Sequence, residues 1–184
     1  PQRLPSLKVL WMNIFSYSGP TEKETASLRR SCKLFSKALT PPCWTSYPHP
    51  MYSSLQGLFG RINALSRRGS TNLPKLVLIE NGIHDEGGNI VRINISISII
   101  GESRKHCVVI GGLRMNGKKE DDVNVSNLTL SDSNGCGVYG CNYGASFHLD
   151  NVSVENSEYQ GVSVGGTKRN TMKNCNVSHS KGSG

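Results

Sequence analysis

Three near-copies of one eleven-residue pattern run through the C-terminal part of the chain and constrain its fold more than any other feature. An asparagine near the middle of each copy marks the spacing, because Asn127 precedes Asn151 by 24 residues and Asn151 precedes Asn174 by 23. A fixed period in this range is typical of stacked supersecondary units, in which each unit buries its apolar face against the next. The copies are Val123–Ser133, Phe147–Ser157 and Asn170–Ser180.

Apolar residues alternate with polar ones on either side of this asparagine, and further apolar residues follow a downstream glycine. Alternation over so few residues indicates short strands with one buried face. Three such strands per 23–24 residues, separated by corners rich in Asn, Ser and Gly, predict an all-β solenoid. We expect a right-handed parallel β-helix over residues 73–184, incomplete at its C-terminal end. Its upstream coil is expected to be longer, with Ile97 aligned to Leu128, Ile99 aligned to Leu130, and a loop around Lys118–Asp122.

The repeated asparagines are predicted to be structural corner residues. Asparagine tolerates the left-handed backbone conformation, and its amide can hydrogen-bond the equivalent amide in the neighbouring coil. The alternative is that some asparagines accept N-linked glycans, because several open an N-x-S/T sequence. Corners rich in Asn, Ser and Thr generate such matches by chance, which favours the structural interpretation. The predicted corners are Asn127, Asn151 and Asn174, and the glycosylation matches are Asn94, Asn124, Asn127, Asn151 and Asn176.

Six cysteines are present, at irregular spacing and without a C-x-x-C pair, so the sequence predicts no zinc site and no other metal site. A disulfide between Cys136 and Cys141 stays open as an alternative. Cys175 aligns with Leu128 and Val152, which are expected core positions, and a buried free thiol behaves as a small hydrophobe. Reduced cysteines favour the cytoplasm or nucleus, and secretion is the alternative.

The formal net charge of +8 lies entirely in residues 1–74, while residues 75–184 are neutral, which suggests two modules. The basic residues are scattered among apolar ones and form no nucleic-acid-binding motif, so we expect a solvated basic face and no nucleic-acid partner. No apolar stretch approaches the roughly 20 residues needed to span a bilayer, and no membrane partner is expected.

Residues 1–50 are predicted to be helical, because apolar residues recur at helical spacing. Gly-Pro and Pro-Pro pairs mark the ends of the expected helices. Residues 51–72 contain a further amphipathic helix that would cap the open end of a solenoid, where strand edges and apolar side chains need covering. For the first helices, the alternatives are an extension of that cap or a signal peptide over Leu7–Phe15.

Residues 73–184 resemble pectin-lyase-like β-helix proteins, in particular through the succession Leu76–His84, Val91–Ile93 and Ile97–Gly101. The resemblance implies a fold only, because this superfamily hosts many functions. Its lyases need acidic calcium ligands with an arginine base, and its hydrolases need several close aspartates with Gly-His-Gly. Neither motif is present, and the neighbouring Asp121 and Asp122 would point to opposite faces of a strand. The sequence therefore predicts no catalytic residue and no cofactor.

Residues 4–44 resemble an F-box, through Leu4-Pro5, Ile14–Tyr17, Arg29–Phe35 and Trp44. F-boxes dock by apolar helices onto the small linker subunit of cullin-type ubiquitin ligases. The resemblance implies that this subunit is a partner and that apolar residues of the first helix bind it. Those residues are Leu4, Pro5, Leu7, Leu10, Ile14 and Phe15.

Two functions follow as hypotheses. The first is a non-enzymatic recognition protein whose β-helix side binds a protein or glycan ligand, with the F-box-like segment making it a substrate adaptor of a ubiquitin ligase. The second is a secreted β-helix protein that binds or degrades polysaccharide. Glycosylated sequons and oxidised cysteines would accompany the second hypothesis and not the first.

Overall fold

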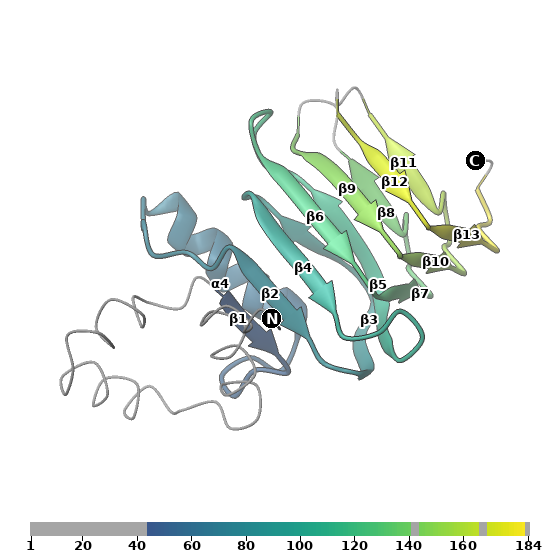
Figure 1. Ribbon diagram of the computed structural model, residues 1–184, viewed down its shortest axis with the longest axis horizontal. Coiled ribbons are helices and arrows are strands. Elements are labelled where there is room, and N and C mark those ends of the chain that lie inside the picture. The colour runs from purple at the N-terminus through teal and green to yellow at the C-terminus, as the bar shows by residue number, and fades with distance from the viewer. Residues whose placement is uncertain (1–43, 141–143, 166–168, 183–184) are drawn as a thin grey trace, which may run out of the picture. The chain divides into compact units, whose positions relative to one another are not determined.

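The computed structural model describes residues 44–140, 144–165 and 169–182, which form a parallel β-solenoid of about four turns (Figure 1). Short strands alternate with tight corners, and a helix lies between the first two described strands. The elements are β1 (Trp44–Tyr47), α4 (Leu55–Arg67), β2 (Leu76–Ile79), β3 (Gly82–Ile93), β4 (Ile97–Gly101), β5 (Cys107–Met115), β6 (Asp122–Ser126), β7 (Thr129–Ser131), β8 (Val138–Gly140), β9 (Ser146–Asp150), β10 (Ser153–Glu155), β11 (Val162–Val164), β12 (Thr171–Lys173) and β13 (Asn176–Ser178).

Parallel pairing between successive coils builds two sheets. The first has the strand order β1-β2-β4-β6-β9-β12, and the second has the order β11-β8-β5-β7-β10-β13, with β3 paired to β5. The long strand β5 serves two faces, because Val108–Ile110 pairs with β7 whereas Leu113–Met115 pairs with β8. Each coil therefore contributes three strand segments that face a common interior, as the repeat pattern predicts.

Inward-facing side chains stack from coil to coil and form one continuous core. In the first sheet, Val123 pairs with Phe147 and Val125 pairs with Leu149, and all four side chains are fully buried. Alternation places their neighbours on the outer face, where Asn124 is exposed. The solenoid thus buries apolar residues contributed by coils that are more than twenty residues apart in sequence.

The asparagine corners have the left-handed backbone, with φ of 56° at Asn127, 55° at Asn151 and 55° at Asn174. The Asn151 Nδ2 group donates to the Asn127 Oδ1 atom at 2.9 Å, which links the two corners along the stack. The next link differs, because Asn174 Nδ2 donates to a carboxylate oxygen of Asp150 at 3.2 Å. Coil corners are thus held by side-chain hydrogen bonds as well as by strand pairing.

Helix α4 packs its apolar stripe into the core at the N-terminal end of the stack. Ser54 caps the helix, since its hydroxyl oxygen accepts the Gly57 N–H at 3.0 Å. A buried carboxylate also holds the first turn: the Leu55 N–H donates to Glu86 Oε1 at 2.6 Å, and the Gln56 N–H donates to Oε2 at 3.0 Å. A negative charge is favourable at this positive end of the helix dipole. The buried apolar residues of the stripe are Leu55, Leu58, Phe59 and Ile62.

A second polar anchor lies further along α4. The Asn63 Nδ2 group donates to the Arg92 carbonyl at 2.8 Å, and the Asn94 N–H donates to Asn63 Oδ1 at 3.2 Å. One buried amide therefore satisfies two backbone groups of the chain around the end of β3. Together with Glu86, it fixes the helix to β3 in one register.

The structure differs from the expectation of a helical segment over residues 1–50. Trp44–Tyr47 form strand β1, which pairs in parallel with β2, so the first sheet begins before the helix. This strand lies outside the repeat and is followed by prolines, so neither period nor composition indicates it. The preceding residues, among them the F-box-like Leu4, Pro5, Leu7, Leu10, Ile14 and Phe15, lie outside the described residues.

The expected alignment of the upstream coil is wrong. Ile97 pairs with Val123 and Ile99 with Val125, both 26 residues on, and not with Leu128 and Leu130. The extra residues lie mainly in the loop 102–106 between β4 and β5, since only Asn127 and Leu128 separate β6 from β7. Because several apolar pairs in this coil share the same spacing, the sequence alone offers more than one alignment.

Loop 102–106 lies along the asparagine corners. The Thr129 hydroxyl donates to the Arg104 carbonyl at 2.7 Å, and the Arg104 Nη1 group donates to the Asn174 carbonyl at 3.1 Å. One arginine thus connects the upstream coil to a corner 70 residues later. Among the residues that the structure describes, no helix has the length and apolar character needed to cross a bilayer.

Candidate functional site

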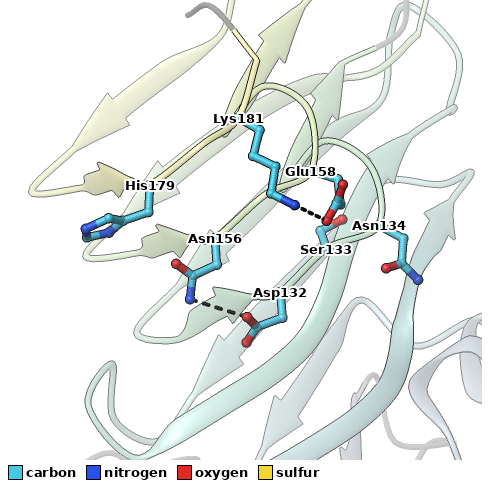
Figure 2. Close-up of a pocket in the computed structure, with 7 residues that line it drawn as sticks. All are labelled: Asp132, Ser133, Asn134, Asn156, Glu158, His179 and Lys181. Atoms are coloured by element: carbon cyan, nitrogen blue, oxygen red, sulfur yellow. Dashed lines mark hydrogen bonds and ion pairs between the residues drawn. The ribbon is translucent and has the colours of Figure 1, made fainter.

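An open groove of about 370 Å³ runs across three successive coils, over the turns that follow β7, β10 and β13 (Figure 2). Its lining is polar and includes groups of both charges, with hydrogen-bond donors and acceptors side by side. The lining residues are Asp132, Ser133, Asn134, Asn156, Glu158, His179 and Lys181.

One wall of the groove is a second column of left-handed corners. Asp132, Asn156 and His179 follow one another at 24 and 23 residues, and their φ angles are 51°, 55° and 53°. Equivalent positions in stacked coils lie one above the other at the strand spacing of about 4.8 Å. The three side chains therefore form a column along the solenoid axis, as Figure 2 shows.

Hydrogen bonds hold this wall in place. The Asn156 Nδ2 group donates to Asp132 Oδ1 at 3.3 Å, and the Ser131 hydroxyl donates to the other carboxylate oxygen of Asp132. Asn156 and the exposed His179 also line the groove. This wall therefore offers a fixed carboxylate, an amide acceptor and an imidazole within three coils.

The other wall repeats with the same spacing through Asn134, Glu158 and Lys181. The Lys181 Nζ atom lies 2.6 Å from Glu158 Oε1 and joins two coils by an exposed ion pair. Asn134 Nδ2 donates to the Gly87 carbonyl at 3.0 Å. A Cβ atom added at Gly88, which has φ +72°, would lie only 2.6 Å from the Asn134 amide, so the bend in β3 leaves just enough room for that side chain.

Between the two walls, a serine column points into the solenoid. Ser133 donates its hydroxyl to the Cys136 carbonyl at 3.0 Å, and Ser157 is fully buried. A Cβ added at Gly137 would meet the Ser157 hydroxyl at 2.9 Å, and one at Gly161 would meet Ser180 at 2.7 Å. The repeated glycines thus make room for the serines beneath the groove.

A separate polar cluster lies on the outer face of the first sheet. The Thr171 hydroxyl and His148 Nδ1 are 2.8 Å apart, and His148 Nε2 lies 3.6 Å from Asp122 Oδ1. The Arg169 Nη2 atom also lies 3.6 Å from that oxygen. The imidazole thus contacts a hydroxyl and a carboxylate on the outer surface of the sheet.

The paired aspartates of the sequence do not form an acid–base pair. Asp121 accepts the Ser96 hydroxyl at 2.8 Å and the Lys118 N–H at 2.7 Å, so it stabilises the turn before β6. Asp122 is the first residue of β6 and contacts His148 instead. In the part of the chain that the structure describes, no cluster of three or more histidine, cysteine or acidic side chains could hold a metal ion.

Three cysteines are described, and all three are free thiols. Cys107 is fully buried, whereas Cys136 and Cys175 are half-buried. Cys175 packs against the core as its alignment with Leu128 and Val152 predicts, but it is less buried than either of them. The expectation of a buried thiol is therefore only partly met, because Cys175 belongs to the last described coil.

The sequence alone does not predict the groove, although the spacing of its residues is visible in the repeat. The repeat copies contain Asp132, Asn156 and His179 at equivalent positions, but three different side chains conceal the shared corner conformation. The comparisons with known proteins add no further constraint, since no family model, no curated protein and no solved structure matches the chain.

Proposed function

We propose that the chain is a non-enzymatic recognition protein that binds a polar ligand in the groove formed by its three coils. The two columns, Asp132–Asn156–His179 and Asn134–Glu158–Lys181, are the observation that supports this proposal. A hydrogen bond between Asn156 and Asp132 and an ion pair between Lys181 and Glu158 hold these side chains before any ligand arrives. Preorganised polar groups lose little conformational entropy on binding, which favours recognition.

The composition of the groove selects the chemistry of its ligand. Carboxylate and amide oxygens accept hydrogen bonds, while the Lys181 ammonium group donates them, so the walls suit a ligand that offers both kinds of group. The opposite charges of Glu158 and Lys181 largely cancel. A polar segment of a protein or an uncharged glycan fits this surface, and its repeating contacts would lie about 4.8 Å apart along the solenoid.

The F-box-like resemblance of residues 4–44 extends this proposal to a substrate adaptor. The solenoid would bind the ligand, and the apolar first helix would recruit the linker subunit of a cullin-type ubiquitin ligase in the cytoplasm or nucleus. Capture of the linker subunit from a lysate by the full chain, and its loss in Ile14→Asp and Phe15→Asp variants, tests this role. No capture by the unmodified chain would rule out the adaptor function and leave ligand binding standing.

The groove itself is tested by screening the full chain against arrays of oligosaccharides and of unmodified peptides. We expect Glu158→Ala and Asn156→Ala each to weaken a genuine ligand about tenfold or more, because each removes a fixed hydrogen-bonding group. Lys173→Ala, an exposed change on the outer face of the first sheet, is the matched control. Ligands whose affinity is the same in all three variants would contradict the groove proposal.

The secreted polysaccharide-binding or polysaccharide-degrading alternative has one observation in its favour. Asn124 opens an N-x-S sequence and is exposed on β6, where an attached glycan would meet no core residue. By contrast, the Asn127 and Asn151 amides are joined to each other. A glycan mass on the secreted chain that disappears in Asn124→Gln, together with release of reducing ends from polyuronates, would replace recognition with this alternative.

A further inference from the structure

A column of outward-facing residues distinct from the groove crosses the second halves of β3 and β5 and continues over β8 and β11. Strand register places Arg92 beside Arg114, Arg114 beside Tyr139, and Tyr139 beside Ser163. We call these four residues the arginine face. Their strands lie about 4.8 Å apart, so both guanidinium groups and the phenol ring share one continuous surface.

Arg114 is held in a defined orientation on this surface. Its Cζ atom lies 4.9 Å from the centroid of the Tyr139 ring, and its Nε–H donates to Asn116 Oδ1 at 2.9 Å. Ring stacking and the Nε bond fix the guanidinium plane. No bond to a described residue occupies its two terminal nitrogens, which are the pair that binds a carboxylate in a bidentate manner.

The positive charge of the arginine face has no anionic partner within the described part of the chain. Arg92 is exposed beside Arg114, and like charges on adjacent strands repel each other. Carboxylates on or beside these strands are engaged elsewhere: Asp85 accepts the Gly87 N–H, Glu86 binds the first turn of α4, and Glu102 accepts the Asn81 N–H. An external anion would relieve the repulsion.

We propose that the arginine face binds an acidic peptide segment of a partner protein, whose carboxylates pair with Arg114 and Arg92 while the chain passes over Tyr139. Planar guanidinium groups match carboxylates in geometry as well as in charge. A nucleic acid fits less well, because its affinity at physiological salt comes from many phosphate contacts and this face offers two cations. The proposal does not depend on the groove, which uses other residues.

The test measures binding of a fluorescent decaglutamate peptide to the full chain at low and physiological salt, with a decalysine peptide as the charge control. Arg114→Gln and Arg92→Gln should each weaken decaglutamate binding roughly tenfold. Arg169→Gln, the same chemical change on the outer face of the first sheet, should leave it within about twofold. Because Arg92 is exposed and its side chain supports no described contact, its variant tests the face without a risk of misfolding.

Variants of Tyr139 distinguish the effect of holding Arg114 in one orientation from the effect of its charge. Tyr139→Phe keeps the aromatic ring under Arg114 and should bind decaglutamate within about twofold, whereas Tyr139→Leu should weaken it severalfold. Equal affinity in Arg114→Gln and the unmodified chain would overturn the proposal. Tighter binding of a phosphorylated peptide or of single-stranded DNA of the same charge would also overturn it, since the occupant would then be a phosphate ligand.

Discussion

The inner coils and the last described coil have the same inward-facing pattern but very different burial. Leu149 on β9 and Met172 on β12 are paired in register, yet Leu149 is 1% exposed and Met172 is 46% exposed. Val154 on β10 and Val177 on β13 repeat this contrast, at 0% and 43%. The position of a coil in the stack, and not its residue type, therefore decides how much apolar surface it buries.

The N-terminal end of the stack buries its apolar surface in a different way. There α4 lies against β3, and Glu86 binds the first turn of the helix while Asn63 binds the backbone at the end of β3. Phe59 and Ile62 are as deeply buried as residues of the inner coils. A helix with two polar anchors thus supplies what a neighbouring coil supplies elsewhere.

The contrast bears on the groove, because its walls draw on both kinds of coil. Asp132 and Asn156 follow strands of the inner coils, while His179 and Lys181 belong to the last described coil. Two rows of the groove are therefore backed by a buried core, and the third row has less support. We expect the first two rows to set the register of a ligand.

The largest expected effect comes from truncating register partners in the two regions. Leu149→Ala should lower the free energy of unfolding by about 2–5 kcal/mol, because it leaves a cavity in the core. Met172→Ala should cost less than about 1 kcal/mol, since nearly half of its surface is already exposed. Denaturant unfolding of both variants checks this, and equal losses would break the comparison.

Removing the helix anchor should have the next largest effect. Glu86→Ala deletes a buried carboxylate that accepts two helix N–H groups, and we expect a loss of about 1.5–3 kcal/mol. Glu102→Ala removes an exposed carboxylate that accepts the Asn81 N–H and serves as the control, with a loss below about 1 kcal/mol. Thermal unfolding monitored by circular dichroism measures both losses, and similar values would show that the anchor is dispensable.

The contribution of Asn151 to stability has two parts, its side-chain hydrogen bond and its left-handed backbone conformation. Asn151→Gly keeps an easy left-handed conformation and removes only the 2.9 Å bond to Asn127. Asn151→Ala adds the left-handed backbone penalty, and its total cost should exceed that of glycine by about 1–2 kcal/mol. Chemical denaturation of the two variants gives the difference. If alanine were no worse than glycine, the backbone conformation would not explain why asparagine occupies this corner.

The smallest effect at neutral pH concerns the cysteine thiols of the two regions. Burial, with a smaller contribution from the Glu102 carboxylate, raises the pKa of Cys107 from 9.0 to about 11. Since the unfolded thiol ionises first, the contribution of Cys107 to stability is complete below pH 9 and is lost as the pH rises towards 11. Cys107→Ala should therefore flatten the alkaline loss of stability. Burial also raises the pKa of Tyr47, so part of that loss should persist in the variant.

Alkylation kinetics provide the companion measurement for the cysteines. In the folded chain at pH 8, half-buried Cys175 should react with iodoacetamide much faster than fully buried Cys107. Peptide mass spectrometry of the labelled chain resolves the two sites. Equal rates would mean that the inner coil opens as often as the last one.

The sequence predicts the fold well wherever the repeat is regular. Corners at Asn127, Asn151 and Asn174 define the strands around them, because one inserted residue would turn every inward side chain outward. Upstream, loop 102–106 and the long strand β5 change the coil length, and apolar alternation alone cannot locate those changes. Strand β1 carries no repeat at all, and its place in the sheet depends on pairing with β2.

The candidate site was harder to predict for a related reason. A groove depends on which outward side chains lie next to each other across coils, and that requires the correct register. Within the repeat this register is available, so Asp132, Asn156 and His179 could have been aligned as a second corner. Arg92 and Arg114 could not, because their adjacency depends on the β3–β5 pairing, which contains a register shift.

Hydrogen–deuterium exchange of the backbone amides tests most directly whether position in the stack determines local stability. We expect slow exchange in β6, β7, β9 and β10, which pair with a strand on both sides, and much faster exchange in β12 and β13, which have similar sequences but pair with one described strand each. We also expect slow exchange in β2, on the side of the stack that carries α4. Uniform protection across all these strands, or faster exchange in β9 than in β12, would contradict the account.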